Sequence, residues 1–244
     1  MTTLLPSRRK FLAQTTGSLA LGLSGLSVFA AEPPRSAGTT LIPYGAAVRA
    51  GALASDPAYR AAVAGMCEII VPEGEMKWPD IHPARGEYRF EKADTLVDFA
   101  RQNQIDIRGH TLAWYGALPA WTSEFANGAE AERELVDHIE TVVSRYRGVV
   151  PSWDVVNEPL ADWPQDRFSL RPSVWMNRLG PEYLPIAFKA AASTDPDAKL
   201  VLNEYDIEYR GARFEARRKA LIQLLRWLRD RDVPLHAEIG RAHV

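Results

Sequence analysis

The segment from Trp153 to Pro159 has the clearest potential for acid–base chemistry. It reads Trp-Asp-Val-Val-Asn-Glu-Pro, and its apolar centre predicts a buried strand that delivers Asn157 and Glu158 to its carboxyl end. Hydrolysis of a glycosidic bond needs one carboxylic acid that protonates the departing oxygen and a second carboxylate that acts as nucleophile or base. The segment therefore makes Glu158 a candidate general acid/base. A structural ion pair at the end of the strand is the alternative.

Polar and aromatic residues follow other predicted strands in the same way. They are Glu73 and Lys77 after the second strand, His110 and Trp114 after the third, and Asn203 and Glu204 after the fifth. In a parallel barrel the carboxyl ends of all strands share one face, where the active site lies. Acids, amides and indoles there suit a neutral polyhydroxylated ligand. As alternatives, Glu73 and Lys77 form a solvated ion pair and His110 is a core histidine.

The elements that must position these residues alternate between strands and helices. We expect strands at residues 41–48, 68–71, 106–111, 152–156, 200–203 and 233–237. Helical stripes of apolar residues run through 93–100, 135–146, 185–194 and 221–228, the second closed by Gly148 as a C-cap. This alternation favours βαβ units and a parallel sheet. We find no internal repeat or linker that divides residues 41–237.

Length and composition narrow the functional class. The 244 residues are close to the ~250 of a typical (β/α)8 barrel. With a formal charge of −2, the chain lacks the excess of basic residues that would attract nucleic acid or an anionic membrane. The single cysteine, Cys67, excludes an internal disulfide, and no cluster has the spacing of metal ligands. We therefore expect no cofactor and no metal.

Several motifs together resemble glycoside hydrolase family ten, a family of retaining endo-1,4-β-xylanases. The motifs are Glu75-Met76-Lys77-Trp78, Gly109-His110-Thr111-Leu112-Ala113-Trp114, Leu118-Pro119-Ala120-Trp121 and Trp153–Pro159. The resemblance implies an α/β fold, the (β/α)8 TIM barrel, over residues 41–237. It also implies that Glu158 is the general acid/base, and that Asn157 bonds the sugar 2-hydroxyl at the cleavage site.

By the same resemblance, four residues would line the glycone subsites: Glu73, Lys77, His110 and Trp114. The segment Asn203-Glu204-Tyr205-Asp206 resembles the Asn-Asp-Tyr-Asn strand end of the family. We expect Asn203, Glu204 and Tyr205 to support Glu158 without contacting substrate. Among the tryptophans we expect only Trp114 to touch sugar, with three residues purely structural: Trp163, Trp175 and Trp227.

The sequence departs from the family pattern in or near the expected substrate cleft. Gly74, Tyr115, Ala117, Pro159 and Glu204 replace the residues that are usual there. These changes leave the sugar and the chain length of the substrate open. Two alternatives also remain: a related barrel glycosidase, such as a family-five cellulase or mannanase, and a non-catalytic sugar-binding relative.

The start of the chain carries the pattern of an export signal. Ser7-Arg8-Arg9-Lys10-Phe11-Leu12 precedes a short apolar run. Paired arginines predict a twin-arginine signal over residues 1–30, and residues 31–40 form a flexible leader. We expect an exported protein, periplasmic or extracellular, with no stable membrane span after signal cleavage. Its expected partner is xylan or a xylo-oligosaccharide, with no nucleic acid, and we expect a monomer.

The other end predicts an incomplete barrel. Residues 238–244 back-translate to a string that contains the start of a common sequencing adapter, so we predict a non-native tail; an ordinary C-terminus is the alternative. The sequence stops near the sixth strand. The Thr-Glu-Leu-Asp type segment that would hold the family's nucleophile on the seventh strand does not occur. We predict an N-terminal fragment without hydrolase activity.

Overall fold

A computed structural model describes residues 43–165 and 169–241. The predicted signal (1–30), the leader (31–40) and residues 242–244 of the predicted tail lie outside the described residues. The strands are β1 (Gly45–Val48), β2 (Ile69–Pro72), β3 (Asp106–Trp114), β4 (Ser152–Asn157), β5 (Lys199–Tyr205) and β6 (Ala237–Arg241). The longer helices are α2 (Pro57–Met66), α4 (Glu91–Asn103), α5 (Gly128–Arg145), α7 (Tyr183–Thr194) and α8 (Ala212–Arg229). The short ones are α1 (Ala50–Ser55), α3 (Trp78–Ile81), α6 (Val174–Leu179) and the 3₁₀ turns η1 (Ala120–Glu124) and η2 (Gly180–Glu182).

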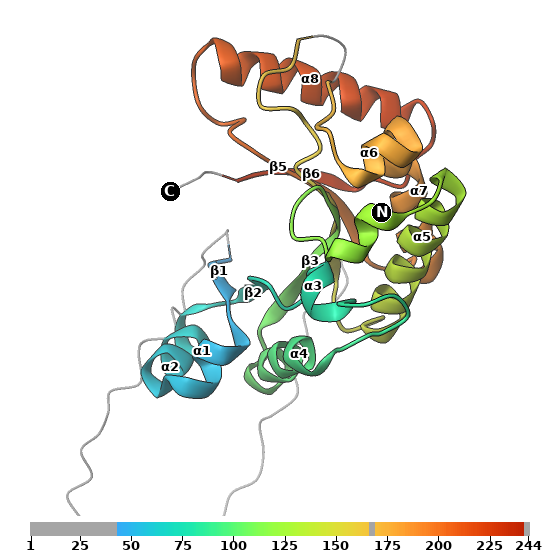
Figure 1. The fold of residues 1–244 in the computed structure, drawn as a ribbon. Helices are drawn as coiled ribbons and strands as arrows, with labels where there is room; N and C mark the ends of the chain where they lie inside the picture. Colours follow the sequence, from blue (N-terminus) through green and yellow to red (C-terminus); the bar gives the residue numbers. More distant parts are fainter. Residues whose placement is uncertain (1–42, 166–168, 242–244) are drawn as a thin grey trace, which may run out of the picture. The chain divides into compact units, whose positions relative to one another are not determined.

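The six strands form one parallel sheet in the order of the sequence (Figure 1). Helices connect consecutive strands, as the right-handed crossovers of a (β/α)8 barrel require. The predicted α/β class is confirmed, and the sheet that the structure describes runs from the first to the sixth strand of such a barrel. Because all strands are parallel, their carboxyl ends lie along one edge.

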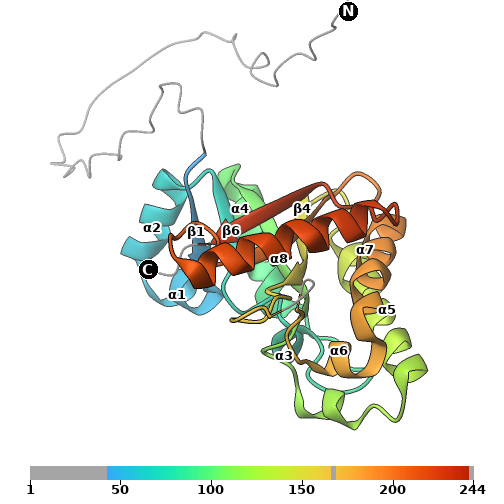
Figure 2. The same cartoon turned by 90° about the horizontal axis from the view of Figure 1, so that it is seen from above.

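Helix packing follows the predicted apolar stripes. In α5, Leu135, Ile139 and Val142 are fully buried, and α5 lies beside α7 (Figure 2). The predicted C-cap at Gly148 was wrong, because α5 already ends at Arg145. Gly148 instead adopts a positive φ of 71° in the turn that leads to β4.

Close packing between β3 and β4 depends on one glycine. A Cβ atom at Gly109 would lie 2.0 Å from the indole of Trp153, which is fully buried. Gly109 therefore lets the ring of Trp153 lie against the backbone of β3.

The sixth strand begins later than the sequence predicts. Residues 233–236 form no strand; β6 starts at Ala237. Pro234 has no N–H for a sheet ladder, and the N–H of Leu235 bonds locally to the carbonyl of Val233 at 2.7 Å. β6 then pairs with β5 from Val201 onward. Residues 238–241 of the predicted tail thus pair as strand, and their non-native origin stays a prediction.

None of the helices in the described part of the chain combines the length and apolar character needed to cross a bilayer.

Candidate active site

Glu158 follows directly on β4 and is held by both neighbouring strands. Its backbone adopts φ 53°, and its N–H donates to the carbonyl of Asn203 on β5 at 2.7 Å. Its carboxylate accepts a hydrogen bond from Nε1 of Trp114, at the end of β3, at 3.0 Å. Glu158 is only 4% exposed. The backbone and the carboxylate are therefore both fixed at the carboxyl ends of β3, β4 and β5.

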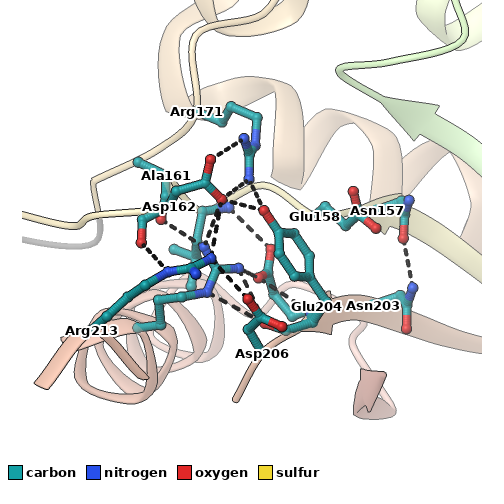
Figure 3. A network of polar contacts seen from close by, with 12 residues as sticks. Asn157, Glu158, Ala161, Asp162, Arg171, Asn203, Glu204, Asp206 and Arg213 are labelled. Atoms are coloured by element: carbon teal, nitrogen blue, oxygen red, sulfur yellow. Dashed lines mark hydrogen bonds and ion pairs between the residues drawn. The ribbon is translucent and has the colours of Figure 1, made fainter. Parts of the chain in front are cut away.

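Asn157 and Asn203 form an amide pair beside Glu158 (Figure 3). The two residues are register partners in β4 and β5, and Nδ2 of Asn203 donates to Oδ1 of Asn157 at 2.6 Å. Both are buried. Because Oδ1 of Asn157 accepts this bond, its Nδ2 faces away from Asn203 and can donate to another group.

A cavity of about 510 Å³ opens beside Asn203. Four predicted site residues line it: Glu73, Lys77, His110 and Asn203. Arg108 and Asp154 line it as well. The structure thus brings these residues from β3, β4, β5 and the segment after β2 to one cavity, which is large enough for a ligand of a few hundred Å³.

His110 is oriented by a charged chain that crosses from β3 to β4. Its Nδ1–H donates to Oδ2 of Asp154 at 2.9 Å, and Nε of Arg108 donates to Oδ1 of Asp154 at 3.0 Å. Burial would raise the pKa of Asp154, but the bonds from His110 and Arg108 outweigh burial, and the pKa lies below its ordinary value. His110 is therefore a hydrogen-bonded residue of the cavity wall, in contrast to a histidine packed among apolar residues.

The spacing of Glu73 and Lys77 along the chain suggested, as an alternative, a solvated ion pair between them. In the structure each of the two also contacts another residue. Glu73 forms an ion pair with Arg49, and this contact lowers the pKa of Glu73. Nζ of Lys77 lies 4.8 Å from the ring centre of Trp114, a cation–π distance. Trp114 therefore contacts Lys77 through the face of its ring and Glu158 through its Nε1.

Glu204 is buried near the carboxyl end of β5 and is surrounded by hydrogen-bond donors. It is fully buried and forms an ion pair with Arg217 of α8, which is also fully buried. The N–H of Leu160 donates to Oε1 of Glu204 at 3.2 Å. Burial raises the pKa of Glu204 to about 7, although Arg217 and the backbone N–H groups act in the opposite direction.

Tyr205 takes part in a second set of charged contacts, with Asp162 and Arg171. Figure 3 shows Asp162 next to Arg171. The Tyr205 hydroxyl donates to Asp162 and accepts from Nη2 of Arg171 at 2.6 Å. Arg171 also binds both carboxylate oxygens of Asp162 at 3.0 and 3.1 Å. These hydrogen bonds, led by the one from Arg171, lower the pKa of Asp162 to about 2.

The sequence prediction missed several residues of this region. Asp154 is the one charged side chain inside an apolar strand, and Arg217 falls in the same helical stripe as Leu221, Leu224 and Leu228, so both carried a signal. Asp162 and Arg171 lie in a loop, and no pattern in the sequence pointed to them. Among the residues that the structure describes, no three His, Cys, Asp or Glu side chains come together in a way that could hold a metal ion.

Sequence comparisons point to one family. The family model described as "Glycosyl hydrolase family 10" matches residues 35–243. Endo-1,4-beta-xylanase B of Thermotoga neapolitana is 40% identical over 177 residues, which cover 72% of this chain and 49% of that protein. Endo-1,4-beta-xylanase B of Paenibacillus barcinonensis is 39% identical over 172 residues, covering 68% of this chain and 50% of that protein. The chain thus spans about half the length of these relatives.

Solved structures agree with the sequence comparisons. Native xylanase 10B from Thermotoga maritima superimposes with a TM-score of 0.74 at 36% identity, covering 82% of this chain and 61% of that one. A psychrophilic glycoside hydrolase family 10 endo-beta-1,4-xylanase gives a TM-score of 0.76 at 34% identity, covering 82% of this chain and 63% of that one. From the fold, the site and these matches, the chain belongs to glycosyl hydrolase family 10.

Proposed function

We propose that this chain is the N-terminal part of a retaining endo-1,4-β-xylanase in which Glu158 is the general acid/base. One observation carries the proposal most directly: the Glu158 carboxylate is held by Nε1 of Trp114 at the carboxyl end of β4, beside the Asn157–Asn203 pair. The relatives that match this chain are named as endo-1,4-β-xylanases, which supports the choice of substrate.

In this proposal Glu158 acts twice. It first gives its proton to the glycosidic oxygen while the C–O bond breaks and a second carboxylate bonds to the anomeric carbon. The Glu158 carboxylate then takes a proton from the water that displaces that carboxylate. Asn157 donates from Nδ2 to the 2-hydroxyl of the sugar, since the bond from Asn203 holds its amide in the required orientation. Trp114 keeps the Glu158 carboxylate in place during both steps.

The cavity would hold the sugars on the glycone side of the scissile bond. The bond to Asp154 places the proton of His110 on Nδ1, so Nε2 is left to accept from a sugar hydroxyl. Glu73 and Lys77 line the same cavity and bond hydroxyls as acceptor and donor.

We propose that the nucleophile lies outside these 244 residues. Glu204 is a poor candidate because it is fully buried, and Arg217 and the N–H of Leu160 occupy its oxygens. A carboxylate so enclosed has no access to an anomeric carbon. The chain by itself should therefore bind xylan without hydrolysing it.

An activity assay tests this proposal. Purified residues 31–244 are incubated with xylan, and reducing ends are measured, with the Glu158→Gln variant as the matched control. We expect no release above background from either protein. Release that disappears in Glu158→Gln would show that the nucleophile is within the chain. The downstream DNA provides a second test, since we expect it to encode a seventh-strand glutamate.

We further propose export by the twin-arginine route, on the basis of Arg8 and Arg9. Replacing both by lysine should retain the precursor in the cytoplasm, as followed by immunoblotting of cell fractions. Unchanged export of the double variant would contradict the route.

A further inference from the structure

The chain bends sharply directly after β4, and Glu158 is the first residue of this bend. Glu158 adopts a positive φ of 53°, which is unfavourable for a residue with a side chain and persists only where neighbouring contacts fix it. The next residue is Pro159, whose ring restricts its own φ, and Leu160 after it is fully buried. The direction of the Glu158 side chain therefore depends on what holds Leu160 and Ala161.

Arg217 of α8 holds both Leu160 and Ala161. Nη1 of Arg217 donates to the carbonyl of Ala161 at 2.8 Å, and its Nη2 pairs with the carboxylate of Glu204. Glu204 in turn accepts from the N–H of Leu160 through Oε1 at 3.2 Å. Nε of Arg217 donates to the carbonyl of Tyr205 at 3.3 Å. One guanidinium thus joins the bend after β4 to the end of β5 through all three of its nitrogens.

The surroundings of Arg217 favour a role in orientation. Arg217 is fully buried, and the other buried residues of α8 are apolar or aromatic. An apolar pair in the place of a buried ion pair is often as stable or more so, which means that stability alone does not account for the pair of Arg217 and Glu204. A guanidinium, by contrast, presents its donors in fixed directions, which an apolar side chain or an ammonium group does not reproduce. What this pair fixes is the geometry of the bend, and Glu158 lies on that bend.

We propose that Arg217 is a positioning residue for Glu158, an inference that rests on the proposed function of Glu158 as general acid/base. Arg217 fixes the bend after β4, and the bend aims the Glu158 carboxylate at Nε1 of Trp114, 3.0 Å away. Without the guanidinium, the carbonyl of Ala161 loses this donor and Glu204 loses its cation, so the bend relaxes. The Glu158 carboxylate then leaves the position from which it protonates the glycosidic oxygen. Arg217 itself does not contact the sugar, since it is fully buried.

The indole N–H of Trp114 reports the geometry at Glu158 without requiring catalysis, because this group donates to the Glu158 carboxylate. Its signal is recorded in proton–nitrogen NMR spectra of the 244-residue chain and its variants. Trp114→Phe identifies the signal by removing it, and Glu158→Gln shows that the signal responds to the carboxylate. The indole N–H of Trp78 is the internal reference, since it donates to the carbonyl of Leu112 at 2.7 Å, a bond that involves no residue of the bend.

Three variants on α8 carry the test. We expect Arg217→Met to move the Trp114 signal further than the Trp78 signal, because the bend that aims Glu158 is no longer held. Arg217→Lys keeps a cation in the chain at this position, so it should move the Trp114 signal in the same direction by less. Arg229→Met, the matched control, removes an exposed guanidinium from the same helix and should leave the Trp114 signal in place.

The outcomes separate the role of Arg217 from the proposed function. A Trp114 signal that stays in place in folded Arg217→Met, or that moves no further than the Trp78 signal, would overturn the positioning role and leave the proposed function standing. If Arg217→Met does not fold, Arg217→Lys decides: a displaced Trp114 signal supports the role, and an unmoved one overturns it. A displaced signal in a chain that does not bind xylan would contradict the proposed substrate and leave the positioning of Glu158 by Arg217 standing.

Discussion

Two regions of this chain bury titratable side chains in different ways. The histidine cluster consists of aromatic rings, stacked on or tilted against one another, from α3, η1, α5 and the loop after α3: Trp78, His82, Tyr88, Trp121 and His138. The arginine network lies at the carboxyl ends of β4 and β5: Asp162, Arg171, Glu204, Tyr205 and Arg217.

The histidine cluster holds its polar atoms without hydrogen bonds. His82 and His138 are fully buried, and their ring nitrogens have no hydrogen-bond partner among the described residues. Their rings pack against Trp78, with the centre of His138 only 3.9 Å from that of Trp78. Burial lowers the pKa of His82 to about 4 and that of His138 well below its ordinary value. Both histidines are therefore buried as neutral rings.

The arginine network instead surrounds its carboxylates with donors. Even so, burial raises the pKa of Glu204 to about 7. In both regions burial favours the neutral form, and the consequences for stability run in opposite directions with pH. The stability that His82 contributes is present above pH 6.5 and is lost as pH falls toward 4. The contribution of Glu204 is present below pH 4.5 and is lost as pH rises toward 7.

The largest expected effect comes from Arg217→Met. The substitution leaves the Glu204 carboxylate buried without its cation, and breaking such a pair costs about 3–5 kcal/mol. Urea unfolding at pH 7.5 measures the loss, which should shrink at pH 4.5, where Glu204 is protonated. Arg229→Met, at an exposed pair on the same helix, is the control and should change stability by less than about 0.5 kcal/mol. An equal effect in both variants would refute a special role for Arg217.

His82→Phe should reduce the pH dependence of the free energy of unfolding that arises from the histidine cluster. Protonation of His82 alone removes about 3 kcal/mol of stability between pH 6.5 and 4, given the shift of its pKa. Phenylalanine cannot titrate, and it replaces nitrogens without partners by carbon, so stability at pH 7 should hardly change. The measurement is the free energy of unfolding at pH 7 and pH 4. The same loss on acidification in parent and variant would contradict the cluster as the acid-sensitive region.

Tyr205→Phe should have the smallest effect of the three. It removes the hydroxyl that bridges Arg171 and Asp162, which costs about 1 kcal/mol. The pKa of Asp162 should rise from about 2 toward its ordinary 3.8, which NMR titration can follow. The stability that Asp162 contributes, present above pH 3.8 and lost as pH falls toward 2, should decrease with it. An unchanged pKa of Asp162 would show that Arg171 lowers this pKa without help from the Tyr205 hydroxyl.

The spacing of apolar residues along the chain was enough to predict most strands of the sheet and the helices that cover it. The stripe of Leu221, Leu224 and Leu228 predicted α8, and short apolar runs predicted five of the strands. The strand ends were less certain because tertiary pairing sets them: β3 continues to Trp114 and β5 to Tyr205, beyond the predicted ends. The short helices α1, α3 and α6 are too brief to show a period.

The candidate site was predictable in its residue types and only in part in its contacts. Glu158, Asn157 and Trp114 are in one place because each ends a parallel strand, which the pattern predicts. The pairing of Glu204 with Arg217 joins a strand to a helix, and that of Glu73 with Arg49 joins two loops. Such partners depend on how elements pack, and spacing along the chain does not encode this packing.

Binding of a linear xylo-oligosaccharide is the most direct test that this site takes xylan. Isothermal titration of the 244-residue chain with xylohexaose, and separately with cellohexaose, compares two β-1,4-linked hexamers of different sugars. We expect xylohexaose to bind more tightly, and Trp114→Ala to weaken that binding by about tenfold, because both the stacked ring and the donor to Glu158 are lost. No heat with xylohexaose, tighter binding of cellohexaose, or unchanged binding in Trp114→Ala would contradict a xylan site at Glu158.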